Sequence, residues 1–90
     1  MTTPIPLKIA YIGGGSREWA RKLMVDLALC PHLTGEVTLY DIDMPSAQLN
    51  AQLGNWMQDQ PGVLSRWQYK TSSTLENALQ GADFVIISIQ

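Results

Sequence analysis

Three consecutive glycines constrain this chain more than any other feature. Gly13, Gly14 and Gly15 follow a short apolar run at 8–12 and precede a segment with the apolar spacing of an amphipathic helix. Ordered glycine costs more conformational entropy than any other residue, so three together indicate a backbone that turns sharply or passes very close to another group. A glycine turn between a strand and a helix is typical of sites where backbone amides bind an anion.

Strand and helix patterns alternate along the rest of the chain. Apolar periodicity predicts strands at 8–12, 37–41, 66–71 and from 83 or 84 onward, and helices at 16–29, 43–58 and 73–81. Asp43 is the expected N-cap of the second helix, with Pro45 in its first turn, and a capping box that begins at Ser73 opens the third helix. Parallel strands joined by right-handed helical crossovers form a doubly wound sheet. We therefore predict an α/β fold of the Rossmann type with strand order 3-2-1-4. Residues 1–90 would form the N-terminal part of this domain.

The predicted core combines two helical stripes with three tryptophans. The first helix is expected to bury Trp19, Ala20, Leu23, Met24, Leu27 and Ala28, and the second Leu49, Leu53, Trp56 and Met57. Trp67 lies in the third predicted strand. We assign all three tryptophans to core packing rather than to a cofactor site.

Composition narrows the possible partners. Six basic and eight acidic side chains give a net charge of −2, which argues against a nucleic-acid or anionic-membrane surface. No apolar run approaches the ~20 residues that a bilayer requires, and the first residues do not resemble a signal peptide. The single cysteine, Cys30, favours the cytoplasm. Because an apolar strand occupies the last residues, we expect these 90 residues to be the front of a longer protein.

The glycine turn has the features of a dinucleotide site. Ligands of doubly wound sheets bind beyond the carboxyl ends of the strands, where the strand order reverses. Gly13 permits a tight turn, Gly15 leaves room for a pyrophosphate, and Ser16 caps the helix or donates its hydroxyl to a phosphate. Arg17 would screen phosphate charge, although a first-turn arginine more often points to water. The third glycine of the usual fingerprint is replaced by Glu18, and a purely structural turn remains the alternative interpretation.

Asp41 supplies a second indication. It ends the second predicted strand, where an acidic residue binds the hydroxyls of the adenosine ribose and repels a 2′-phosphate. This position favours NAD over NADP. Alternatively, Asp41 only caps the following loop, a role that Asp43 could also fill. Cys30 and His32 are expected at the opposite end of the sheet, and two residues make no closed metal site. We predict no metal ligand and no catalytic residue within this chain.

The segment KIAYIGGGS at 8–16, followed by Trp19-Ala20-Arg21, resembles the N-terminus of glycoside hydrolase family 4. Residues 39–43 and 82–89 fit the same family, so the resemblance covers nearly the whole chain. The GGGSxxWAR run is most similar to the α-galacturonidase branch. A Gly-x-Gly-Ser turn without the third glycine is also the pattern of this family.

The resemblance implies an unusual glycosidase that depends on NAD and Mn²⁺, whereas most glycosidases use two carboxylates. NAD⁺ would remove a hydride from C3 of the sugar, the aglycone would leave by elimination, and the hydride would return after water adds. Mn²⁺ would act as a Lewis acid. The family's base and metal ligands are expected beyond Gln90, so the 90 residues alone should be inactive.

The resemblance also assigns site residues. Gly13, Gly15 and Ser16 would lie at the pyrophosphate and Asp41 at the ribose, while Ser88 and Ile89 would approach the cofactor from the fourth strand. The substrate would be a small-molecule glycoside and the full-length enzyme a homo-oligomer. Two other classes stay open: an NAD-dependent 2-hydroxy-acid dehydrogenase of the lactate/malate type, and a non-catalytic nucleotide-binding module.

Overall fold

The computed structural model describes residues 3–88, so Ile89 lies outside the described residues. The elements in chain order are β1 (Ile5–Ile12), α1 (Arg17–Ala28), β2 (Leu33–Tyr40), α2 (Met44–Met57), β3 (Trp67–Thr71), α3 (Leu75–Leu79) and β4 (Phe84–Ile87). This confirms the predicted alternation. β1 and β2 begin earlier than predicted, because they pair along their full length from Ile5 opposite Leu33 to Ile12 opposite Tyr40.

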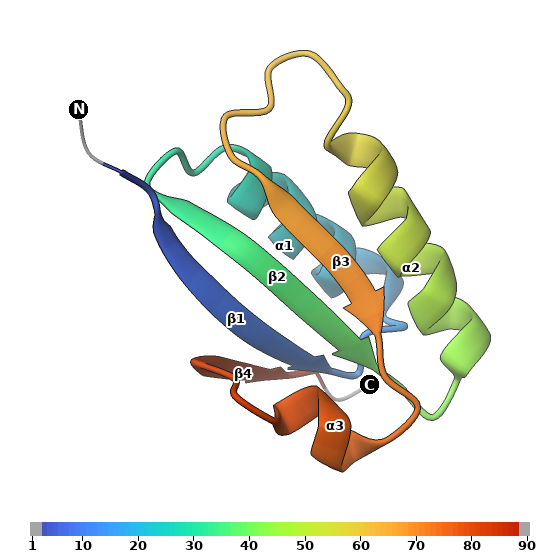
Figure 1. Ribbon diagram of the computed structural model, residues 1–90. Coiled ribbons are helices and arrows are strands. Elements are labelled where there is room, and N and C mark those ends of the chain that lie inside the picture. The colour runs from blue at the N-terminus through green and yellow to red at the C-terminus, as the bar shows by residue number, and fades with distance from the viewer. Residues whose placement is uncertain (1–2, 89–90) are drawn as a thin grey trace.

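The four strands form one parallel sheet in the order β3-β2-β1-β4 (Figure 1), which confirms the predicted 3-2-1-4 order. Helices α1 and α2 pack against each other and cover one face, whereas α3 contacts β1 and β2 from the opposite face. The strand order reverses between β1 and β4. The glycine turn follows β1 and therefore lies at the carboxyl-end edge of the sheet, beside the point where the strand order reverses.

Side-chain caps determine where two of the helices begin. Asp43 is the N-cap of α2 and accepts a hydrogen bond from the Ser46 amide, and Pro45 lies in the first turn, as predicted. The predicted cap at Ser73 is wrong by one residue. Thr74 is the N-cap of α3, and its hydroxyl accepts a hydrogen bond from the Asn77 amide at 3.2 Å.

The core lies between the sheet and the α1–α2 layer. Its buried members are Ile9, Tyr11, Ala20, Met24, Leu27, Val37, Leu39, Ala47, Ala51, Trp67 and Tyr69. Trp67 is therefore a core residue as predicted. The prediction is wrong for the other two tryptophans, because Trp19 and Trp56 are 60% and 59% exposed.

Helix α2 buries a different face from the one predicted. Its buried residues are Ala47, Asn50, Ala51 and Gly54, while Leu49 and Trp56 are exposed and Leu53 and Met57 are half-buried. Gly54 shows the physical reason: a Cβ there would come within 2.5 Å of the Tyr69 ring. The helix thus approaches β3 so closely that small residues face the sheet, and the large apolar side chains turn outward.

Within residues 3–88, the helices are all too short or too polar to span a bilayer.

Candidate functional site

The amides of the glycine turn are all used inside the protein. The Gly13 and Gly14 amides both donate to the Tyr40 carbonyl, at 2.8 and 2.9 Å. The Gly15 amide donates to Asp41 Oδ2 at 2.8 Å, and the Ser16 amide donates to the Gly13 carbonyl at 3.1 Å. An anion at this edge would therefore be bound by other donors than these four amides.

Close packing against the strand ends explains the three glycines. Gly13 has a φ of +91°, as the predicted tight turn requires, and a Cβ there would overlap the Ser88 carbonyl oxygen. A Cβ on Gly14 would lie 2.6 Å from Leu39 Cβ, and one on Gly15 would lie 2.8 Å from Asp41 Oδ2. Protein atoms thus surround the positions that side chains would occupy. The sequence prediction had attributed the missing Gly15 side chain to space for a pyrophosphate.

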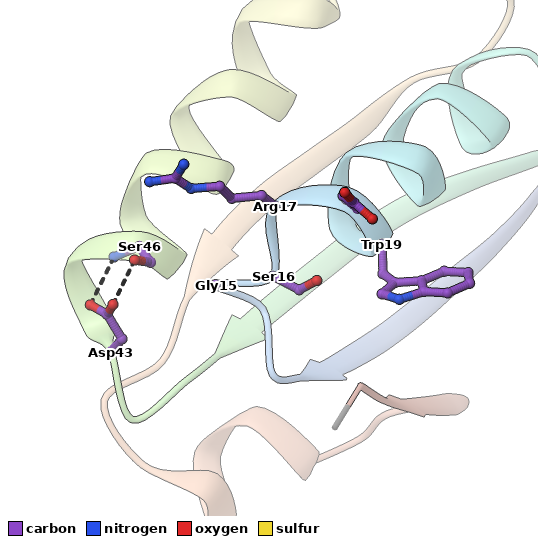
Figure 2. A pocket seen from close by; sticks show the side chains of 7 residues that line it. Gly15, Ser16, Arg17, Trp19, Asp43 and Ser46 are labelled. Carbon is purple, nitrogen blue, oxygen red and sulfur yellow. Dashed lines mark hydrogen bonds between the residues drawn. The ribbon is translucent and has the colours of Figure 1, made fainter. Parts of the chain in front are cut away.

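Asp41 connects the glycine turn to the loop that follows β2. Its Oδ2 accepts the Gly15 amide, and its Oδ1 accepts the Asp43 amide at 2.9 Å. Asp41 therefore caps the following loop, as the alternative interpretation held, and also holds the turn. A carboxylate has about four acceptor positions, so capacity for two ligand hydroxyls remains. The Asp43 carboxylate is used by the amide and the hydroxyl of Ser46 (Figure 2).

A cavity of about 310 Å³ opens beside the turn. Its lining consists of Ile12, Gly13, Tyr40, Asp41, Ile42, Ile87 and Ser88. The fold therefore brings together Gly13, Asp41 and Ser88, which lie far apart in the sequence. Ile42 is 95% exposed, and with Ile87 it offers an apolar wall next to the Asp41 carboxylate. An apolar wall beside a hydroxyl acceptor suits a nucleoside, which has a flat base and a ribose.

A second cleft, of about 520 Å³, lies at the start of α1. Its lining consists of Gly15, Ser16, Arg17, Glu18, Trp19, Asp43 and Ser46 (Figure 2). Ser16 is the N-cap residue, but its side chain makes no cap hydrogen bond with the described residues. The first-turn amides of a helix have no intrahelical acceptors and lie at the positive end of its dipole. This end of α1 is therefore the remaining source of amide donors near the turn.

Arg17 and Trp19 leave the first turn of α1 in different directions. Arg17 is exposed and extends toward α2, as the water-facing alternative predicted, while Trp19 points toward the β1 side (Figure 2). Trp19 also lines a further cavity with Tyr11, Ile86 and Ser88. The Glu18 carboxylate shares the cleft with Arg17, so the two side chains partly cancel each other's charge there.

Asn50 is a site residue that the sequence did not single out. It lies in the middle of α2, is buried, and donates through Nδ2 to the carbonyls of Gly14 and Ser16. The one available signal was a polar residue among small ones, since Ala47, Ala51 and Gly54 share its helical face. That signal becomes visible only when the small residues are recognised as the packing face.

Cys30 and His32 lie far from the turn. The His32 carbonyl accepts the amide of Ile5, the first residue of β1, so both residues are at the amino end of that strand. Residues 3–88 contain no group of three or more His, Cys, Asp or Glu side chains positioned to hold a metal ion.

Comparison with known proteins gives three consistent results. The model of a family described as family 4 glycosyl hydrolase matches residues 8–90. An α-galacturonidase from Lachnoclostridium phytofermentans is 51% identical over 83 residues, which are 92% of this chain and 18% of that protein. Over the same length, the α-galacturonidase from Thermoanaerobacter italicus is 55% identical, and that from Bacillus subtilis is 51% identical.

The crystal structure of lplD from Bacillus subtilis, described as a candidate glucosidase, has the same fold. It superposes with a TM-score of 0.81 and 50% identity over 93% of this chain and 18% of that one. The chain thus spans less than a fifth of the length of the relatives it matches.

Proposed function

The chain belongs to family 4 of the glycosyl hydrolases, and we propose that it is the NAD-binding portion of an enzyme that cleaves α-glycosides. The relatives over 50% identical are named α-galacturonidases, which makes α-galacturonides the proposed substrate class. The proposal also includes a cytoplasmic location and a homo-oligomeric full-length enzyme.

One arrangement carries the proposal: the glycine turn, Asp41 and an apolar-walled cavity meet where the strand order reverses. Adenosine would occupy the cavity beside Ile42 and Ile87, with its ribose hydroxyls bound to the free acceptor positions of Asp41. The diphosphate would bind the first-turn amides of α1 rather than the amides of the turn itself, which already have acceptors. The negative charge of Asp41 would disfavour the 2′-phosphate of NADP.

Bound NAD⁺ would supply a reversible hydride acceptor, and Mn²⁺ would supply a Lewis acid. The residues of this chain would bind and orient the cofactor. The metal ligands and the catalytic base would come from outside residues 1–90, as the resemblance implies.

The dehydrogenase alternative predicts a different product balance. A 2-hydroxy-acid dehydrogenase oxidises its substrate outright, so NADH accumulates. An enzyme that returns the hydride cleaves a glycoside without net NADH. Membership of a glycosyl hydrolase family supports the glycoside-cleaving enzyme over the dehydrogenase. Incubating the full-length gene product with NAD⁺ and either an α-galacturonide or lactate and malate, while recording absorbance at the NADH band, separates the two.

Binding of the cofactor is tested by titrating NAD⁺ and NADP⁺ against the full-length gene product in a calorimeter. We expect NAD⁺ to bind more tightly than NADP⁺. Asp41→Ala should weaken NAD⁺ binding about tenfold or more, because it removes the ribose acceptor and frees the Gly15 amide. Asp41→Asn keeps an oxygen for that amide but removes the charge, so it should narrow the difference between NAD⁺ and NADP⁺.

Thr74→Ala is the control, because the Thr74 hydroxyl caps α3 and Thr74 lines neither of the two cavities at the glycine turn. Loss of a cap costs about 1 kcal/mol of stability, and NAD⁺ affinity should stay within about twofold of wild type. Unchanged NAD⁺ affinity in Asp41→Ala would remove Asp41 from the site. Failure of the wild-type protein to bind NAD⁺ would remove the proposed function.

A further inference from the structure

Asn50 makes a contact that its position in a helix does not require. Its side chain is 2% exposed, and its Nδ2 donates to the Gly14 carbonyl at 2.8 Å and to the Ser16 carbonyl at 3.0 Å. A primary amide nitrogen carries two hydrogens. Both are therefore used to hold carbonyls of the glycine turn, 34 and 36 residues away in the sequence.

These two bonds fix the orientation of two peptide planes. In a trans peptide the carbonyl and the amide point in opposite directions, and the described residues contain no cis peptide. The peptide between Gly14 and Gly15 is held at its carbonyl by Asn50 and at its amide by Asp41. The peptide between Ser16 and Arg17 is held at its carbonyl by Asn50, so the Arg17 amide faces away from α2.

Space filling alone does not account for asparagine at this position. Asparagine is a poorer helix former than alanine or leucine, and burying its amide is costly unless the amide is hydrogen-bonded. An apolar residue would fill the space but would leave two buried carbonyls without this donor. The bonds to the turn are the feature that only a side-chain amide of this length provides.

We infer that Asn50 is a positioning residue for the cofactor. It holds the glycine turn in the shape that leaves the first-turn amides of α1, beginning with Arg17, pointing toward a diphosphate. Asn50 touches the turn and not the cofactor, so it acts through the backbone of Gly14 and Ser16. This inference rests on the proposed function, because it assumes that a dinucleotide binds at this edge.

The same helix offers a matched control. Asn55 also makes two bonds to main-chain atoms: its Nδ2 donates to the Tyr69 carbonyl and its Oδ1 accepts the Tyr69 amide, both at 2.8 Å. These bonds join α2 to β3 instead of to the turn. Removing either asparagine side chain therefore removes two bonds to the backbone, but only one removal reaches the proposed diphosphate site.

The test compares the wild-type full-length gene product with Asn50→Ala and Asn55→Ala. Affinities for NAD⁺, ADP and adenosine are measured by calorimetry at a temperature well below each melting temperature. We expect Asn50→Ala to weaken NAD⁺ and ADP about tenfold and to leave adenosine within about twofold. Asn55→Ala should leave all three affinities near wild type although its melting temperature falls.

The three ligands separate positioning from general loss of structure. Equal weakening of NAD⁺, ADP and adenosine in Asn50→Ala, or no weakening of any of them, overturns the inference. If Asn50→Ala does not fold, Asn50→Ser takes its place, because its single hydroxyl hydrogen cannot bind both carbonyls. Wild-type NAD⁺ affinity in Asn50→Ser would likewise overturn the inference.

The outcomes also separate the two proposals. If the wild-type protein does not bind NAD⁺, the proposed function fails and the inference falls with it. If the wild-type protein binds NAD⁺ but Asn50→Ala and Asn55→Ala bind it equally well, only the role of Asn50 is rejected.

Discussion

The two halves of the sheet differ sharply in how far their side chains are buried: β2 and β3 form a covered side, and β4 forms an open side. On β2 and β3, the residues Val37, Leu39, Trp67 and Tyr69 are at most 3% exposed. On β4, which pairs with β1 in the same parallel manner, Phe84, Val85 and Ile87 are 58%, 49% and 66% exposed. Strands on both sides are therefore hydrogen-bonded through the backbone, but only β2 and β3 have these deeply buried side chains. Helix α2 packs on β2 and β3, whereas the five-residue α3 contacts β1 and β2 and has a single buried residue, Ala78.

The proposed cofactor site lies at the boundary between these two sides. The covered side supplies its supports, because Asp41 follows β2 and Asn50 belongs to α2. The open side supplies Ile87 and Ser88, which line the cavity next to Gly13. Ligand sites combine apolar walls with a few placed polar groups, and this boundary brings both together.

The largest expected effect tests burial on the covered side with two tryptophans. Trp67→Ala should lower the free energy of unfolding by about 3–5 kcal/mol, because it leaves a cavity in the core and removes the bond from Trp67 Nε1 to Ser65 Oγ. Trp56→Ala, at an exposed position of α2, should cost less than about 1 kcal/mol. Urea denaturation followed by circular dichroism measures both, and equal losses would show that the exposure of Trp56 is not maintained in solution.

A second prediction makes the same substitution on each side. Val37 is completely buried on β2 and Val85 is half exposed on β4. Val37→Thr should cost about 2 kcal/mol, because a hydroxyl enters an apolar core without a partner. Val85→Thr should cost less than about 0.5 kcal/mol. Urea denaturation of the full-length gene product measures both losses of stability. Similar losses would show that Val85 is as buried there as Val37.

The smallest expected effect concerns the buried hydroxyl of Tyr69 on the covered side. The Tyr69 hydroxyl is buried and has no hydrogen-bond partner among the described residues, and its burial raises the pKa of Tyr69 above the ordinary 10.0. Tyr69→Phe removes this unpaired group and should change stability by between zero and about +1 kcal/mol.

The raised pKa also gives a sign for the pH dependence. The folded state keeps the Tyr69 proton at pH values where the unfolded state loses it, so wild-type stability falls as pH rises above 10.0. Tyr69→Phe should lose less stability than wild type over that range in parallel urea titrations. A steeper loss in the variant would show that folding lowers the pKa of Tyr69 instead of raising it.

Local patterns were sufficient for the order of the elements and for the position of the glycine turn. Apolar runs, the Asp43 cap and Pro45 are short-range signals, and each depends on residues within about one helical turn. The parallel order 3-2-1-4 followed from the handedness of the crossovers. These signals also led to Gly13 and Asp41, which the fold brings to one cavity.

The sequence by itself therefore determined the α/β alternation, the strand order and the position of the glycine turn after β1, because chain chirality and hydrogen-bonding geometry act locally. Only the tertiary structure decided which side chains are buried and which groups hold the turn. Trp56 is large and apolar, yet α2 packs through Ala51 and Gly54 because its axis lies too close to β3 for bulky residues. Size and hydropathy are properties of a residue, whereas the distance between a helix and a sheet is a property of the whole fold. Because α2 lies this close to the rest of the fold, the Asn50 side chain reaches the carbonyls of Gly14 and Ser16 and holds the turn.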